Sequence, residues 1–422
     1  MKLKITNGTL ANPAGASGKL DIMIEDGMIK AIGNNLGEAD SVIDAAGKTI
    51  FPGFIDLHCH LREPGQEYKE DIASGAKSAA KGGFTAICCM PNTAPAIDNA
   101  STCALVLEKA RHAVVKVYPV GAATKGLAGK ELTEMGELAE MGCVAFSDDG
   151  KPIESGGMMR AAMRYAETFG RFIMAHEEDM SIKGSGTMNE GYNATILGLE
   201  GISRAAEESM ISRDLILAET YGMRVHIQHV STRGGVRMIR EAKGRGVRVT
   251  CESAPHYFSA DESACLTYDG RTRVNPPLRS ADDVAAVKEG LLDGTIDTIA
   301  TDHAPHHRDE KNIEFALAAS GIIGFETAFS LAVTNLTDDA DTLAKLLSLN
   351  PASIIGKPGG IIKEGAPADI TIADMDAEYV LTEMSIVSRS KNTPFIGQTL
   401  RGVVTHTIVD GKLVYDGGNA CR

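Results

Sequence analysis

The two ends of the chain alternate apolar and polar residues with the two-residue period of half-buried β-strands. The alternation occurs in five segments, at residues 3–6, 20–24, 369–372, 403–409 and 412–415. Asp-Gly pairs stand at residues 26–27 and 410–411, and such a pair between two strands is typical of a β-hairpin. Because chain ends commonly lie close together, we expect residues 1–51 and 357–422 to form one small β-sandwich-like domain with a shared sheet.

Between these ends, short apolar runs alternate with longer stretches rich in Ala, Glu and Lys, which is the pattern of repeated βα units. Eight strands are expected, at residues 54–57, 84–88, 116–120, 143–146, 172–175, 224–228, 248–251 and 298–300. Eight parallel strands within residues 52–356 predict an α/β fold with a (β/α)8 TIM barrel, whose functional groups lie at the C-terminal strand ends. A doubly wound open sheet is the alternative, but no GxGxxG motif follows the first strand.

The size and charge of the chain narrow the class of function. Its 422 residues, 43% of them hydrophobic, can bury one large core, so a barrel and a smaller unit fit better than several equal domains. The formal net charge is −14 and Lys and Arg form no dense block, which argues against a nucleic-acid or anionic-membrane surface. We expect a small-molecule enzyme in which any anionic substrate is held by local positive charge.

Neither a signal peptide nor a membrane span is expected. The N-terminal segment MKLKITNGTL has no long apolar run, and the most apolar later stretch, residues 315–333, is interrupted by Gly and Glu. The eight cysteines are scattered, without a CxxC pair, in a chain too large to need disulfide bonds. We therefore expect ordinary buried thiols and a cytoplasmic location.

Six potential metal ligands follow the ends of predicted barrel strands. After the first strand, alternation along an extended segment points His58 and His60 to one side and Cys59 to the other. A His-x-His pair taken alone is weak evidence of a metal site. The further candidates, each after a later strand, are Asp149, His176, His229 and Asp302. Each occupies a position at which a barrel places functional groups.

This set of donors predicts a centre with two metal ions. Four imidazoles and two carboxylates suit Zn²⁺, and six protein ligands exceed the number that one catalytic zinc ion takes. Two ions need a bridging ligand. Asp149 is the expected bridge because a carboxylate offers two oxygens, whereas Asp148 would point away if the strand stays extended to this point. Asp148 remains the alternative.

Six motifs are spread over the whole predicted barrel. They are His58–Gly65 (HCHLREPG), Met90–Thr93 (MPNT), Phe146–Gly150 (FSDDG), Gln228–Thr232 (QHVST), Asn275–Arg279 (NPPLR) and Thr301–His306 (TDHAPH). The set resembles that of bacterial-type (class I) dihydroorotases of the amidohydrolase superfamily. The HxH pair, the strand-end histidines and the late Asp are shared by the wider superfamily, whereas the combination of HLREPG, MPNT and NPPLR is characteristic of dihydroorotases.

The resemblance implies how the ligands divide between two zinc ions per subunit. It assigns His58, His60 and Asp302 to one ion, His176 and His229 to the second, and Asp149 to the bridge. Hydantoinases, allantoinases and many other relatives use a carboxylated lysine as the bridge. Here the stretch FSDDG has no Lys before Lys151, so the chain resembles the Asp-bridged subgroup.

The resemblance also implies the substrate. Dihydroorotases cyclise N-carbamoyl-L-aspartate to (S)-dihydroorotate, reversibly, in de novo pyrimidine biosynthesis. By resemblance the ring carboxylate is held by Arg62, Asn92 and His306, the ring amide by Asn275, Ser320 and Gly321, and His60 also contacts the substrate. A planar guanidinium suits a carboxylate. Taken alone, Arg62 would equally fit a surface ion pair with Glu63 or Glu67, but beside the HxH pair we favour the substrate role.

The expected reaction takes place over the two metal ions. A water activated by them attacks the ring carbonyl, which one ion polarises. Asp302 then takes the proton and passes it to the departing ring nitrogen as a general base and acid. Run backwards, the same groups close carbamoyl aspartate to dihydroorotate.

Two other functions compete with this one. Another cyclic amidase, such as a hydantoinase or allantoinase, would be expected to carry the bridging Lys and a different set in place of Arg62, Asn92 and Asn275. A non-catalytic homologue would have no reason to keep all six metal ligands. The sequence leaves open whether the enzyme is a homodimer and whether it works in complex with aspartate transcarbamoylase.

Overall fold

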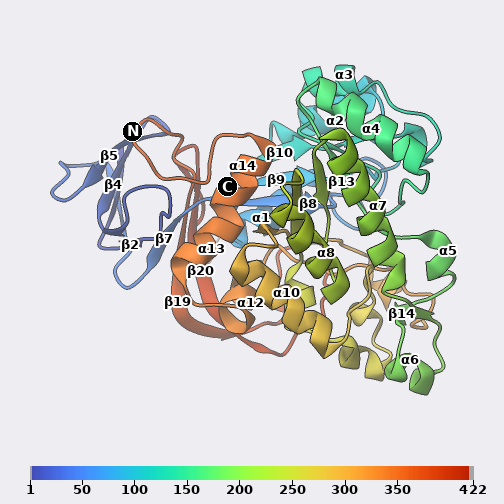
Figure 1. Ribbon diagram of the computed structural model, residues 1–422. Helices are drawn as coiled ribbons and strands as arrows, with labels where there is room; N and C mark the ends of the chain where they lie inside the picture. Colours follow the sequence, from blue (N-terminus) through green and yellow to red (C-terminus); the bar gives the residue numbers. More distant parts are fainter. Residues whose placement is uncertain (1, 418–422) are drawn as a thin grey trace.

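The computed structural model describes residues 2–417, and parallel strands form a closed barrel at its centre (Figure 1). The barrel strands are β8 Phe54–Cys59, β9 Phe84–Cys89, β10 Lys116–Pro119, β11 Gly121–Ala122, β12 Phe146–Ser147, β13 Ile173–Ala175, β16 Val225–Ile227, β17 Val249–Ser253 and β18 Thr298–Ile299. The third strand is interrupted at Val120, so that β10 pairs with β9 and β11 pairs with β12. A parallel bridge between Cys59 and His303 joins the last strand to the first. The predicted (β/α)8 fold is confirmed.

The fourth barrel strand is shorter than the sequence suggested. Residues 143–145 were expected in the strand, but the regular ladder begins at Phe146. Residues 143–145 still contact the third barrel strand, because Val144 N–H donates to the carbonyl of Pro119 over 3.1 Å. Proline has no N–H with which to return a hydrogen bond, and the ladder is therefore irregular at this point.

Helices cover the outside of the barrel (Figure 1). The longer ones are α1 Ile72–Lys81, α2 Ala100–Ala110, α3 Met135–Met141, α4 Gly156–Thr168, α7 Ala205–Tyr221, α8 Arg233–Gly244, α10 Ala281–Asp293 and α12 Ala328–Asn335. The shorter ones are α5 Met180–Lys183, α6 Tyr192–Leu197, α9 Pro255–Ser259, α11 Arg308–Lys311, α13 Ala340–Ala344 and α14 Asn350–Ile355. Side-chain caps set several starts, including Asp71 for α1 and Ser280 for α10. Across residues 2–417, no helix has both the length and the apolar character needed to cross a membrane.

The chain ends form two sheets outside the barrel, the first from N-terminal strands alone and the second from strands of both ends. One has the order β5 Met28–Gly33, β4 Asp21–Glu25, β1 Lys2–Thr6 and β6 Ser41–Asp44. The other has the order β21 Lys412–Tyr415, β20 Thr399–Val409, β19 Ile370–Val380, β7 Thr49–Pro52, β2 Thr9–Leu10 and β3 Gly18–Lys19. Because β7 pairs with β19, the expectation that the two ends share a sheet is confirmed. Figure 1 shows these strands together on one side of the barrel.

We propose that residues 1–51 and 357–422 form one domain and that residues 52–356 form the catalytic barrel. One apolar cluster supports this division, since it joins residues from both sheets, among them Ile5, Ile50 and Ile370. The small domain is firmly attached to the barrel. At the junction the ring of Phe51 lies 5.5 Å from that of Phe54, centroid to centroid.

The cysteines behave as small apolar side chains. Seven of them lie in the described part of the chain, and all seven are free and buried. The sulfur atoms of Cys103 and Cys143 are 3.7 Å apart, which is well beyond the length of a disulfide bond. The expectation of buried thiols is confirmed for these seven, and Cys421 lies outside the described residues.

Gly82 ends α1 at a point where the chain touches the backbone of a distant loop. A Cβ added here would lie 2.0 Å from the carbonyl oxygen of Phe325, although the φ of −76° suits any residue. We predict that Gly82→Ala destabilises the fold by about 1–3 kcal/mol, because the backbone must shift to admit the methyl group. Urea unfolding followed by circular dichroism measures the change.

The matched control for this prediction is Gly244→Ala, at the end of α8. A Cβ there meets nothing within 4 Å, and alanine favours a helix over glycine, so this variant should be neutral or more stable. Equal unfolding midpoints for Gly82→Ala and Gly244→Ala would contradict the prediction.

Candidate metal centre

The barrel brings the six predicted metal ligands to one place, at the C-terminal ends of its strands. His58 lies in β8 and His60 just after it, and the other four follow β12, β13, β16 and β18, namely Asp149, His176, His229 and Asp302. All six side chains are buried. These six residues are spread from position 58 to position 302, so closure of the barrel brings them together.

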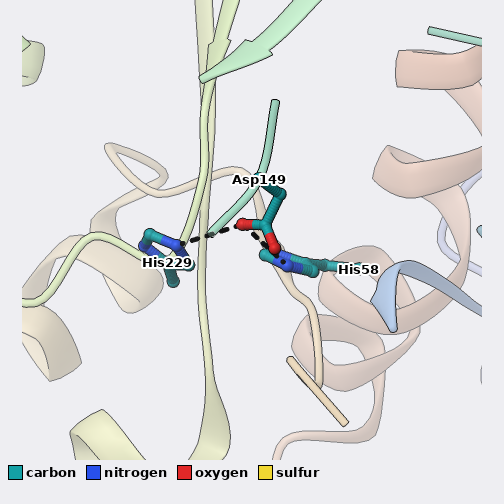
Figure 2. A group of neighbouring side chains, drawn as sticks. All are labelled: His58, Asp149 and His229. Atoms are coloured by element: carbon teal, nitrogen blue, oxygen red, sulfur yellow. Dashed lines mark ion pairs between the residues drawn. The ribbon is translucent and has the colours of Figure 1, made fainter. Parts of the chain in front are cut away.

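Asp149 lies among four imidazole rings. Its Oδ1 is 3.4 Å from Nε2 of His58, 3.5 Å from Nδ1 of His176 and 3.7 Å from Nε2 of His229. Its Oδ2 is 3.5 Å from Nε2 of His60. Figure 2 shows the carboxylate between the rings of His58 and His229. A carboxylate that faces ligands on both sides occupies the position that a bridging ligand needs.

Asp148 faces a different environment. Its Oδ1 accepts hydrogen bonds of 2.9 Å from the backbone N–H groups of Ala123 and Thr124, and its Oδ2 accepts one from the Thr124 hydroxyl. These bonds tie the end of β12 to the loop after β11. The geometry therefore favours Asp149 over Asp148 as the residue that faces the histidines.

The donor set fits a bound divalent metal. Two groups of side chains bring their ligand atoms within 4.8 Å of one another, His58 with Asp149 and His229, and His58 with His60 and Asp302. Nε2 of His58 belongs to both groups, and it is buried without a hydrogen-bond partner. A buried nitrogen without a partner is costly, and a metal ion at this point would satisfy it.

The charge of the site also suits a cation. Burial alone would raise the pKa of Asp302, but the positive charge of His58 and a hydrogen bond from His60 lower this pKa to about 2. The pKa of Asp149 is likewise held well below its usual range, because the charge of His58 and hydrogen bonds from His176, His229 and His58 together outweigh the effect of burial. Two ionised carboxylates in a buried site are stable only if positive charge lies close to them, and a bound cation supplies such charge.

The backbone is strained at three residues of the site. Arg62, His229 and Asp302 have φ angles of 62°, 32° and 44°, in the left-handed region that side chains disfavour. Each costs of order 1–3 kcal/mol and persists only where the surrounding structure holds it. Such residues concentrate at functional sites, where the conformation directs a side chain to a required position.

Glu252 supports His58 from behind and was missed by the sequence analysis. Nδ1–H of His58 donates to Oε1 of Glu252 over 2.7 Å, which directs Nε2 at the site, where a metal ion would take the place of its proton. His226 donates to the other oxygen of Glu252 over 3.1 Å. Glu252 lies next to the predicted strand 248–251, and no spacing marked it as a partner of His58.

Glu178 supports His176 in a similar way and was also missed. Its Oε2 lies 3.5 Å from Nε2 of His176 and accepts hydrogen bonds from Lys183 over 2.9 Å and from Asn275 over 3.1 Å. Nδ1 of His176 therefore faces Asp149 while Nε2 is held on the far side of the ring. A carboxylate in this position fixes the orientation of a metal-binding imidazole.

A cavity of about 300 Å³ opens above the centre. It is lined by every predicted site residue except His58, namely His60, Arg62, Asn92, Asp149, His176, His229, Asn275, Asp302, His306, Ser320 and Gly321. His58 is fully buried behind this wall. Lys183, which the sequence analysis did not single out, also lines the cavity. The predicted residues thus share one cavity large enough for a small cyclic molecule.

Arg62 and His306 form the cationic side of the cavity. Nη2 of Arg62 lies 3.2 Å from Nε2 of His306, and Nε of Arg62 donates to the Pro305 carbonyl over 3.1 Å. Burial and the nearby charges of Arg62, Lys69 and Lys311 hold the pKa of His306 well below its usual range. His306 is therefore neutral, and Arg62 supplies the charge.

Comparison with known proteins agrees with this geometry. Residues 47–235 match a family model described as Dihydro-orotase-like. A dihydroorotase from Syntrophotalea carbinolica is 51% identical over 98% of this chain and 99% of its own length. One from Trichlorobacter lovleyi is 48% identical over 99% of this chain and 100% of its own length. The chain belongs to the dihydroorotase family.

Solved structures relate this dihydroorotase family member to other amidohydrolases. An L-hydantoinase (dihydropyrimidinase) from Arthrobacter aurescens matches 100% of the chain and 97% of its own, with a TM-score of 0.89 and 26% identity. A D-hydantoinase, 23% identical, has a TM-score of 0.88 over 100% of this chain and 96% of its own and shows the same fold. The chain is therefore a hydrolase of the amidohydrolase kind that acts on a small molecule.

The support of His58 by Glu252 can be tested through metal binding. We predict that Glu252→Gln weakens the binding of a divalent metal by about 10–100-fold, because the amide accepts less strongly from Nδ1–H and can also present its N–H₂ group. Titration of the metal-free protein with Zn²⁺, in competition with a chromophoric chelator, measures the dissociation constant.

Glu241→Gln, on the exposed side of α8, is the matched control and should bind Zn²⁺ like the unaltered protein. If Glu252→Gln retained the same dissociation constant as this control, Glu252 would have no part in positioning His58.

Proposed function

We propose that the chain is a bacterial-type (class I) dihydroorotase, which closes N-carbamoyl-L-aspartate to (S)-dihydroorotate and opens the ring again in pyrimidine biosynthesis. The observation that carries the proposal is the carboxylate of Asp149 among four histidines, in a cavity with Arg62 on its far side. Relatives named dihydroorotase at about half identity support the activity. The HLREPG, MPNT and NPPLR motifs support the class.

We propose that the centre holds two zinc ions. His58, His60 and Asp302 would hold one, His176 and His229 the second, and Asp149 would lie between them. The mixture of imidazole and carboxylate donors suits zinc, and the partnerless Nε2 of His58 supports a metal at this point. When bound, the metal pair supplies a water that is nucleophilic near neutral pH and polarises the ring carbonyl.

The cavity offers matching groups for the substrate carboxylate. Arg62 uses Nε and Nη2 for contacts with Pro305 and His306, and its Nη1 has no hydrogen bond within residues 2–417. A guanidinium with a free N–H edge binds a carboxylate well. Asn92, whose Oδ1 lies 2.9 Å from Nδ1 of His60, lines the same cavity.

The ring amide has its own partners on the other side of the cavity. Oδ1 of Asn275 is buried without a hydrogen-bond partner, while its Nδ2 donates to Glu178. Because Glu178 fixes which way the amide points, Oδ1 is left to accept the ring N–H. Gly321 also lines the cavity, and it allows His306 to pack beside it, since a Cβ there would lie 2.9 Å from Cδ2 of His306.

Asp302 is placed to move the proton. Its Oδ1 lies 3.1 Å from Nε2 of His60 and 3.6 Å from Nε2 of His58, and Oδ2 has no hydrogen bond in the described part of the chain. A carboxylate with a pKa of about 2 is ionised at neutral pH and starts the ring-opening direction as the base. It then donates the same proton to the departing ring nitrogen, and the closing direction reverses the two steps.

The choice of substrate separates this proposal from a hydantoinase function. We predict turnover of dihydroorotate and carbamoyl aspartate, and turnover of hydantoin at most about one-thousandth as fast, because hydantoin has no carboxylate for Arg62. Steady-state kinetics on one metal-analysed sample measures all three compounds. A chelator should abolish activity, and added Zn²⁺ should restore it. A preference for hydantoin at full metal occupancy would overturn the proposal.

The proton-transfer role of Asp302 can be tested with an isosteric change. We predict that Asp302→Asn lowers kcat for dihydroorotate by about 10²–10⁴-fold, because the amide cannot accept and return the proton. Turnover and zinc content are measured on the same metal-loaded sample. Asp282→Asn, an exposed position on α10, is the control and should leave kcat unchanged. Near-normal turnover of metal-loaded Asp302→Asn would rule out the assigned role.

A further inference from the structure

A second cavity, the outer cavity, lies beside the substrate cavity. Its volume is about 540 Å³, and it is formed by residues 268–271, 306–308, 311–313, Glu383 and residues 389–392. His306 lines both cavities. The two spaces therefore share a wall on the side of the substrate cavity where Arg62 lies. None of the residues in the outer cavity other than His306 has a part in the reaction described above.

The outer cavity is rich in positive charge on an acidic protein. Five of its lining side chains are basic and two are acidic; the basic ones are Arg271, Arg308, Lys311, Arg389 and Lys391, and the acidic ones are Asp269 and Glu383. The chain as a whole has a formal charge of −14. A local surplus of opposite sign within a concave surface focuses the field there.

Two of the five basic side chains are neutralised by acidic neighbours. Arg271 forms an ion pair of 2.7 Å with Asp269, and Arg389 forms one with Asp71. Paired charges of this kind contribute little to the field at a distance. The positive surplus must therefore come from the remaining three.

Those three have no carboxylate within ion-pair distance in residues 2–417. Nζ of Lys311 donates only to the backbone carbonyls of Arg273 and Ala319, over 2.9 and 2.6 Å. Nζ of Lys391 likewise donates to backbone carbonyls, one of them that of Ile386 over 2.6 Å. Carbonyl dipoles orient an ammonium group but do not cancel its charge. The side chain of Arg308 is exposed and lines the cavity, and it has no polar partner within residues 2–417.

The positive field extends toward the substrate cavity. Lys311 is buried, and burial together with the charge of Arg273 lowers its pKa to about 7, so that at neutral pH Lys311 is partly protonated and Arg308 and Lys391 carry most of the unpaired charge. Lys311 is also one of the cations that keep His306 neutral. His306 lies between the cations of the outer cavity and Arg62 of the substrate cavity, so these groups connect the two cavities.

We propose that the outer cavity is an anion-binding vestibule, which takes a carboxylate of the incoming dicarboxylate before Arg62 does. This inference rests on the proposed function, because carbamoyl aspartate and dihydroorotate are both anions. An acidic protein repels such molecules at long range, and a local cationic basin offsets the repulsion near the entrance. Carbamoyl aspartate carries two carboxylates and dihydroorotate one, so the vestibule acts more strongly on carbamoyl aspartate.

Charge changes at Arg308 test the vestibule by kinetics. At low ionic strength, Arg308→Ala should lower kcat/KM for carbamoyl aspartate about threefold and Arg308→Glu about tenfold, with kcat unchanged. The loss should be smaller for dihydroorotate and should vanish near 1 M salt, where the screening length is about 3 Å. Arg164→Glu, an exposed position on α4, carries the same change in total charge and should have no effect. Equal values of kcat/KM for carbamoyl aspartate in Arg308→Glu and Arg164→Glu, at low ionic strength, would overturn the proposed vestibule.

A second measurement does not depend on turnover. Phenylglyoxal modifies accessible arginines, and mass spectrometry of the holoenzyme reports the extent at each position. Millimolar carbamoyl aspartate should slow the modification of Arg308 at least about threefold and leave that of Arg164 unchanged. Turnover of carbamoyl aspartate without protection of Arg308 from phenylglyoxal would overturn the vestibule alone. Protection without turnover would overturn the proposed function and support the anion site, and the absence of both would overturn both.

Discussion

The site depends on the carboxylate of Asp149, which is buried among four imidazole rings. A buried carboxylate is stable only if charge or hydrogen bonds compensate for the water that it has lost. The four histidines come from three places in the barrel, at the ends of β8, β13 and β16, so the compensation exists only when the ring of strands is closed. Folding and the assembly of the metal centre are therefore the same event in this protein.

Carboxylates behind the histidines make this arrangement specific. Glu252 holds Nδ1 of His58, and Glu178 lies against Nε2 of His176. Each fixes which ring nitrogen faces Asp149, so these two rings are preorganised before any metal binds. Glu178 also sets the direction of the Asn275 amide, which links the candidate metal centre to the wall of the cavity above it.

Much of the fold and the site could be predicted because the barrel obeys local rules. Alternation along β8 placed His58 and His60 on one side, and the same rule separated Asp149 from Asp148. Glu178 stands only two residues after His176, but the position of its carboxylate depends on Asn275, 97 residues away. Glu252 could not be predicted because its partner, His58, is 194 residues away on another strand. The outer cavity was missed for the same reason, because its cations come from three separate segments. The irregular start of the fourth strand follows from Pro119, whose effect depends on which strand lies beside it.

The left-handed backbone at Arg62, His229 and Asp302 has a consequence for how the protein can change. Glycine or asparagine would relieve the strain at each position, so selection for thermal stability alone would favour losing these side chains. The three residues therefore stand where stability and activity oppose each other. A more heat-resistant version of this enzyme would have to gain its stability elsewhere, in the helices or the terminal sheets, and leave the rim of the barrel strained.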